Sequence, residues 1–214
     1  MFILTGIIKT EGLDSSNSPL PNPLNAVHRF VKQPRLRLSW LLAFGRNSWW
    51  LIYFIYAPIY TRQSGYGPEL GGFIVTLGML PLLLARVWAR LANRFSMRKL
   101  MMTAYGTTAL LSITAALFAL YDKPSACLVF LVLAAFMATV IDGGGNVPFL
   151  RAVKPLERPA MTSVFMTFRH VSPIVMPGIM TIALWFLPLP FVFIISGLLT
   201  LAMAMLALYL PRSM

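Results

Sequence analysis

Three charged residues lie well away from the ends of long apolar stretches of the chain: Arg46, Asp142 and Arg169. A lone charge near the middle of a bilayer costs at least about 2.5 kcal/mol, so such residues pair with each other or face water or a ligand. Each lies about 6 to 9 residues from the end of its stretch nearest the basic loops, a depth of roughly 9 to 13 Å at the helical rise. We therefore expect Asp142 to neutralise one arginine, and the other to face a watery cavity, an anion or a separate protein half. An ion pair that only fixes the helix register is the alternative.

Asp142 is followed by three glycines and an amide side chain: Gly143, Gly144, Gly145 and Asn146. Each glycine weakens a helix by about 1 kcal/mol relative to alanine. The glycines predict a hinge, either through close approach of another helix or through an unwound turn where backbone groups and Asn146 meet a ligand. A helix end that frays before a loop explains the same residues. Arg46, Asp142 and Asn146 are thus the candidate ligand-binding residues.

The stretch around Arg169 carries two further signals. Histidine is the residue type best suited to carry protons near neutral pH, so for His170 a proton-carrying role and a plain packing role both stay open. Arg169 and His170 are the candidate charge partners in this stretch. Pro173 and Pro177 lie inside the same stretch and predict a kink or hinge there.

The composition requires lipid as the solvent for these stretches. Of 214 residues, 58% are hydrophobic and 11% are charged, whereas soluble domains carry about 25% charged residues. Six stretches are each long enough for a helix to cross about 30 Å of hydrocarbon. They are 39–60, 70–89, 100–120, 125–147, 160–186 and 191–210. The sequence therefore predicts an all-α membrane protein with six transmembrane helices in one bundle, the domain 39–210.

Lysine and arginine fall on alternate connections between these stretches. Five precede the first stretch, four lie between the second and third, three lie between the fourth and fifth, and one follows the sixth. The opposite side has only Arg62 and Lys123. By the positive-inside rule, both termini are cytoplasmic, and we expect the bacterial cytoplasmic (inner) membrane as the location. The net charge of +12 thus indicates orientation and not nucleic-acid binding.

The residues before the first stretch divide into two parts. Residues 1–8 are apolar but too short for a span, residues 9–23 are polar and rich in serine, asparagine and proline, and residues 1–22 therefore predict a flexible cytoplasmic segment. Residues 23–38 predict an amphipathic helix on the membrane surface, from Pro23 to Gln33, followed by a linker; a plain linker throughout is the alternative. Residues 211–214 form a short cytoplasmic tail.

The connection between the second and third stretches, residues 89–99, resembles the cytoplasmic loop motif of the major facilitator superfamily, Gly-x-Leu-Ala-Asp-Arg-x-Gly-Arg-Arg. The matching residues are Leu91, Ala92, Arg94 and Arg98. The departures are Ala89 and Ser96 for the two glycines, Asn93 for the acid, and Met97 for a basic residue. In the family this loop holds helix contacts through its charges, a role that Asn93 weakens because an amide makes no charge-assisted bond.

The resemblance covers residues from about 24 to 214 and is to the C-terminal six-helix half of these transporters. It implies transport of a small solute by alternating access, with a cavity lined by the first and fourth helices of the half. Arg46 and Asp142 would then lie in the cavity, and Arg169 near the interface between halves. A half-length or truncated chain would need an N-terminal half or a second copy as partner, besides the lipid bilayer and the solute. The alternative is a six-helix membrane interaction or assembly protein that does not transport.

Enzyme chemistry has little support in the sequence. It contains no Gly-x-Ser-x-Gly, His-Glu-x-x-His or phosphate-binding Gly-x-x-x-x-Gly-Lys pattern. Cys127 is the only cysteine, which excludes an internal disulfide and a cysteine-based metal site. We therefore predict no enzymatic activity, no cofactor and no metal.

The charge asymmetry makes a direct prediction about topology. Alkaline phosphatase fused after Arg62 or Lys123 should be active, because both residues are predicted outside the cytoplasm. Green fluorescent protein fused after Lys154 should fluoresce, because that loop is predicted inside. Inactive phosphatase at Arg62 or Lys123 would contradict the six-helix arrangement.

Overall fold

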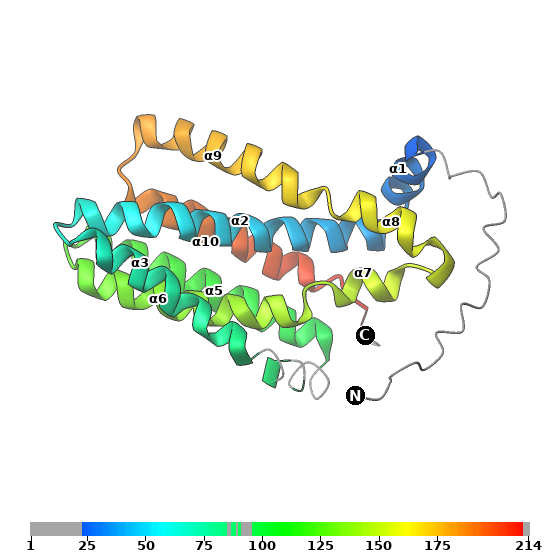
Figure 1. The fold of residues 1–214 in the computed structure, drawn as a ribbon, viewed down its shortest axis with the longest axis horizontal. Coiled ribbons are helices and arrows are strands. Elements are labelled where there is room, and N and C mark those ends of the chain that lie inside the picture. Colours follow the sequence, from blue (N-terminus) through cyan, green and yellow to red (C-terminus); the bar gives the residue numbers. More distant parts are fainter. Residues whose placement is uncertain (1–22, 85–86, 89, 91–95, 212–214) are drawn as a thin grey trace, which may run out of the picture.

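The computed structural model describes residues 23–84, 87–88, 90 and 96–211 (Figure 1). Every regular element in these ranges is a helix, which confirms the all-α prediction for the described part of the chain. The long helices are α2 (Pro34–Gln63), α3 (Pro68–Met79), α5 (Met97–Leu120), α6 (Pro124–Gly144), α9 (Phe168–Phe186) and α10 (Pro190–Ala207). The shorter ones are α1 (Pro23–Lys32), η1 (Leu80–Leu84), α7 (Val147–Ala152), η2 (Pro155–Glu157) and α8 (Arg158–Phe165).

Three helical stretches of the described residues are long and apolar enough to cross a membrane: Met97–Leu120, Pro124–Ala152 and Pro190–Ala207. They coincide with the third, fourth and sixth predicted spans. The apolar stretch Pro68–Leu84 is shorter. The helices α2 and α9 are long enough but less apolar, since α2 contains Arg46 and many tryptophans and tyrosines, and α9 begins with Arg169 and His170. A count of six membrane-spanning helices therefore stays a prediction.

The fifth predicted span, 160–186, consists of two helices. The chain turns at Met166 and Thr167, between α8 and α9, whereas α9 continues through Pro173 and Pro177. The interruption therefore lies upstream of the prolines. Trp40 of α2 donates a hydrogen bond to Thr167 Oγ1 at the turn (3.0 Å). Proline is tolerated within membrane helices because neighbouring groups satisfy the freed backbone, so a role of the prolines as a hinge stays a prediction.

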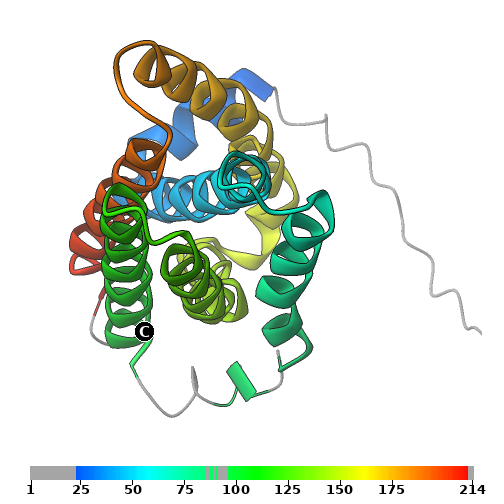
Figure 2. The same ribbon diagram turned by 90° about the vertical axis from the view of Figure 1, so that its left-hand side faces the viewer.

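The helix α2 occupies the centre of the bundle (Figure 2). It packs against α3, α6, α9 and α10, while α5 packs against α6 and α10. Three buried hydrogen bonds join α2 to its neighbours: Tyr53 Oη to the carbonyl of Ile74 (2.7 Å), Trp49 Nε1 to Ser112 Oγ (2.9 Å), and Tyr105 Oη to the carbonyl of Leu42 (2.6 Å). In hydrocarbon these groups have no water to bond, so their partners must come from adjacent helices.

A separate apolar cluster closes the end of the bundle where α1, α7 and α8 meet α2. Phe149 and Phe165 stack with ring centroids 4.2 Å apart, and Phe30 of α1 is buried beside them. The predicted helix at 23–33 is thus present as α1, packed on α8 and the start of α2. Its place at the membrane surface stays a prediction.

Close helix packing in this bundle depends on glycine. A Cβ on Gly78 of α3 would collide with the hydroxyl of Tyr53 and lie 2.9 Å from the Cβ of Ala135, whereas a Cβ on Gly72 would meet nothing within 4 Å. Gly78→Leu should therefore destabilise the protein by about 1–3 kcal/mol through overpacking. Gly72→Leu, the matched control, should be neutral or stabilising, because leucine favours helix by about 1 kcal/mol over glycine.

Thermal unfolding of the two variants in detergent, followed by circular dichroism, measures this difference. Equal midpoints for Gly78→Leu and Gly72→Leu would show that α3 does not pack against α2 and α6 as described.

Candidate functional site

The charged residues of the first and fourth predicted spans meet inside the bundle. Arg46 Nε of α2 lies 3.3 Å from Asp142 Oδ1 of α6. The Arg46 residue is 8% exposed, while the Asp142 side chain retains 26% of its surface. Of the two arginines considered as partners of Asp142 from the sequence, the structure places Arg46 beside it. The carboxylate is the more accessible member of the pair.

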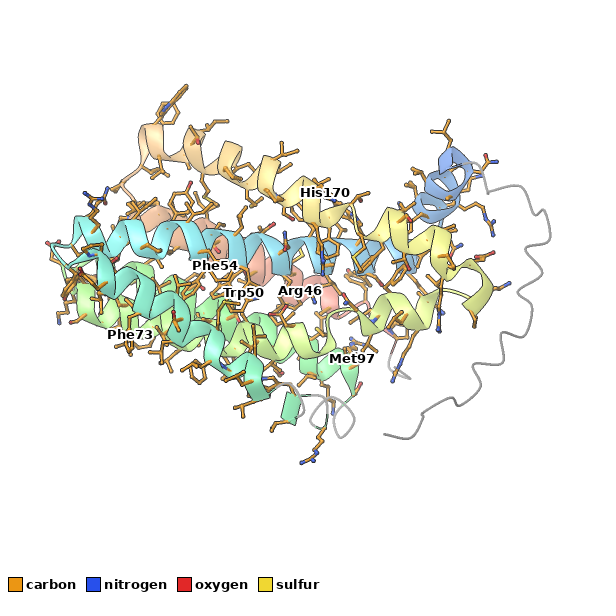
Figure 3. The ribbon with its side chains drawn as sticks, viewed as in Figure 1. Arg46, Trp50, Phe54, Phe73, Met97 and His170 are labelled. Carbon is orange, nitrogen blue, oxygen red and sulfur yellow. The ribbon has the colours of Figure 1, made fainter. Side chains whose placement is uncertain are left out.

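Trp50 completes the coordination of the carboxylate. Its Nε1 donates a hydrogen bond to Asp142 Oδ2 (2.7 Å). Arg46 and Trp50 are four residues apart on α2, so they lie on the same helix face and follow one another along the helix in Figure 3. Each oxygen of Asp142 thus faces one donor from α2. A carboxylate bonded in this way holds α6 at a fixed register against α2.

The guanidinium of Arg46 has two further neighbours. Its Cζ lies 5.8 Å from the ring centroid of Phe168, at the start of α9, within the range of a cation–π interaction. A Cβ on Gly145 would fall on the guanidinium itself. Only glycine at this position lets the turn after α6 approach Arg46, so Gly145 forms part of the surface against which the guanidinium packs.

The three glycines have separate packing partners. A Cβ on Gly143 would lie 2.8 Å from the Cβ of Trp88, and one on Gly144 would lie 2.7 Å from the Met101 methyl. Helix α6 ends at Gly144, and the chain turns at 145–146 before α7. The structure shows the glycines in close approach to neighbouring residues, while the backbone at Gly145 and Asn146 keeps helical angles between α6 and α7. Whether the turn moves as a hinge stays a prediction.

The remaining predicted residues lie away from the ion pair. Asn146 is exposed at the turn between α6 and α7. Arg169 and His170 are exposed near the start of α9, and their side chains have no hydrogen bond or ion pair with any described residue. His170 is labelled in Figure 3. Arg169 is thus the arginine that Asp142 leaves without a carboxylate partner.

Most of the loop motif falls outside the part of the chain that the structure describes. Ala89, Leu91, Asn93 and Arg94 belong to that undescribed part. Arg98 lies in the first turn of α5, where it lines a hollow of about 490 Å³. Packing explains why Met97 stands where the family motif has a basic residue. Met97 is 3% exposed, and its methyl group contacts Gly144. A basic side chain there would bury its charge against α6.

Sequence reasoning missed Trp50, Phe168 and Gly145 as neighbours of the charges. Trp50 had one available signal, its spacing of four residues from Arg46. Aromatic residues such as those of the first span are also typical of the membrane interface. Interpreting Trp50 as an interface residue draws attention away from its spacing of four residues from Arg46. Phe168 had no comparable signal, since its contact with Arg46 joins segments more than a hundred residues apart.

Residues 38–213 match the family model of the Major Facilitator Superfamily. The chain belongs to this superfamily. Members of the superfamily are membrane transporters, so this chain is an integral membrane protein of a transporter family. No curated protein and no solved structure matches this chain.

The ion pair predicts an asymmetric response to mutation. Removing one partner of a fully buried pair typically costs about 3–5 kcal/mol, whereas replacing both by uncharged groups is often neutral. Arg46→Met and Asp142→Asn should each lower stability, and Asp142→Asn the more, because it leaves the buried arginine uncompensated whereas the Asp142 side chain is 26% exposed. The double variant should recover most of the loss, because the side-chain oxygen of the introduced asparagine can still accept a hydrogen bond from Trp50.

Each of the three variants and the wild type is unfolded in mixed micelles by raising the fraction of denaturing detergent. Tryptophan fluorescence follows the unfolding, and the midpoints compare their stabilities. Additive losses in the double variant would show that Arg46 and Asp142 do not interact in the folded protein.

Proposed function

We propose that this chain is one six-helix half of a permease that transports a small solute by alternating access, with Arg46 and Asp142 at the solute site. The observation that carries the proposal is the ion pair between the first and fourth predicted spans, formed by a buried arginine and a partly exposed carboxylate, in a chain that belongs to a transporter superfamily. In the layout that the family resemblance implies, these two helices line the central cavity.

The geometry of the pair favours an anionic or polar solute. A guanidinium has five N–H donors, and Asp142 contacts that of Arg46 through Nε (3.3 Å). A solute carboxylate or phosphate could bind the remaining donors in the bidentate way that such anions favour. An anion that competes with Asp142 for Arg46 would remove one of the two contacts that Asp142 makes with α2 and would weaken the link between α2 and α6, while the hydrogen bond from Trp50 remains. Binding would then change the helix contacts, as alternating access requires.

A second six-helix half would cover the helix faces that the described residues leave exposed. Phe73 on α3, and Ile174 and Ile182 on α9, are each more than half exposed. In the family layout, the second and fifth helices of a half face the other half. We propose that these faces, together with Arg169, contact an N-terminal half or a second copy of the chain. The orientation with both termini in the cytoplasm of a bacterial inner membrane belongs to the same proposal.

One observation favours the alternative, a six-helix membrane protein for interaction or assembly. Arg46 is buried, and both oxygens of Asp142 have donors on α2. Such a satisfied pair is sufficient to fix helix register without any solute.

Uptake measurements on the charge variants separate the two functions. The chain is reconstituted in liposomes, with and without a co-expressed six-helix half, and tested against a panel of anionic, neutral and cationic solutes. We expect uptake to require the second half. The double variant Arg46→Met/Asp142→Asn should remain folded and lose uptake by at least about tenfold, because more than about 1.4 kcal/mol of solute binding disappears with the guanidinium.

Leu110→Ala, which changes an exposed apolar residue on α5, is the control and should keep the wild-type rate of uptake. Wild-type uptake by the double variant would show that the pair is structural. No uptake of any solute by the wild type, with or without a second half, would support the interaction protein.

A further inference from the structure

The helix α1 has an apolar surface that the protein only half covers. On a helical wheel, Ala26 and Phe30 form one side of the apolar arc, and Leu24, Val27 and Val31 form the other. Ala26 and Phe30 are buried, whereas Val27 and Val31 are 44% and 53% exposed. An amphipathic helix that lies freely on a membrane would turn its whole apolar arc toward lipid. Here one half of the arc is packed on the protein and the other is left for a different apolar surface.

Two contacts fix α1 in this orientation. Arg29 forms an ion pair with Glu157, which immediately precedes α8, and Phe30 packs into the cluster around Phe149 and Phe165. The exposed half of the arc therefore has a defined position relative to α2 and α8.

An apolar groove of about 400 Å³ lies between α1, α2 and α8. Val27 and Val31 form its wall on α1, and Trp40 and Leu41 form the wall on α2. Val164 closes the α8 side. Because Val27 and Val31 are also the exposed part of the apolar arc, the groove is continuous with the surface that α1 turns away from the protein.

The charged group at this groove is a cation. Arg37 of α2 lines it and is itself exposed. The segment from Arg29 to Arg37 contains four basic residues and no acidic one. An apolar groove beside an exposed arginine matches a molecule with a long apolar chain and an anionic head.

We propose that the groove between α1, α2 and α8 binds one anionic phospholipid of the leaflet that α1 faces. An acyl chain lies along Val27, Val31 and Leu41, and the phosphate lies against Arg37. Basic pockets near membrane surfaces bind anionic headgroups in this way. The site is distinct from the Arg46–Asp142 pair and does not depend on transport.

The test uses the whole chain, purified in detergent, stripped of lipid and titrated with phosphatidylglycerol or phosphatidylcholine of identical acyl chains. Native mass spectrometry counts the lipid retained. Phosphatidylglycerol should bind at a concentration about fivefold lower, the factor that one arginine contributes beside an anionic headgroup. Arg37→Gln should remove this preference. Arg35→Gln, an exposed arginine on the same helix that does not line the groove, should keep it.

A second pair of variants tests the groove itself. Val31→Trp fills the groove and should reduce retention of both lipids, whereas Leu110→Trp, on an exposed face of α5, should not. Soluble glycerol 3-phosphate should fail to compete, because it has no acyl chain. Equal retention of the two lipids by the wild type, or equal loss of preference in Arg37→Gln and Arg35→Gln, would overturn the proposal and indicate general surface attraction. Competition by glycerol 3-phosphate would overturn the acyl-chain site and indicate a phosphate site alone.

Discussion

The side-chain donors of Trp49, Trp50 and Tyr53 on α2 have no water to bond within hydrocarbon, and the arrangement of the neighbouring helices depends on satisfying these three. Trp49 bonds to α5, Trp50 to α6 and Tyr53 to α3, all within little more than one helical turn. Such interhelical bonds are individually modest, with measured values averaging about 0.6 kcal/mol. An unsatisfied donor in lipid costs several times more, so the bonds matter chiefly by excluding other arrangements. This explains why the least apolar of the long helices lies at the centre.

Glycine makes these bonds sterically possible. The hydroxyl of Tyr53 reaches the backbone of α3 because Gly78 has no side chain at the crossing point. Arg46 fits against the turn after α6 because Gly145 has none. In each case a donor on α2 and a glycine on the facing segment form a complementary pair. The glycines after Asp142 are thus part of the packing around the charges, whatever movement they also permit.

The ion pair and the lipid groove lie at two contrasting places on α2. Arg46 is buried, and the Asp142 carboxylate contacts two donors on α2, so a solute must compete with an existing contact to reach the arginine. The groove is apolar, open on the side of α1 and bordered by an exposed arginine. The turn between α8 and α9 connects them, since Thr167 lines the groove and Phe168 lies against Arg46. A movement of that turn would affect both.

The sequence by itself determined that lipid is the solvent, that the protein is all-helical, and that Arg46 and Asp142 are charges within apolar stretches. These properties follow from composition and from patterns within a few turns of helix, where hydropathy and the 3.6-residue period act locally. The family resemblance of the loop between residues 89 and 99 was also present in the sequence, and the match over 38–213 confirmed it. Composition alone does not fix the number of membrane-spanning helices, because α2 and α9 carry polar residues whose partners the sequence does not show.

Only the tertiary structure decided which arginine pairs with Asp142. Arg46 and Arg169 lie at similar predicted depths, so depth along a helix could not distinguish them. The distance between side chains on different helices depends on rotation and crossing angle, which arise when many weak contacts are satisfied together. The same reason explains why Trp50 and Phe168 were missed, and why the fifth span is interrupted at Met166 and Thr167 instead of at its prolines. Contacts between distant segments fix these features, and no local pattern encodes them.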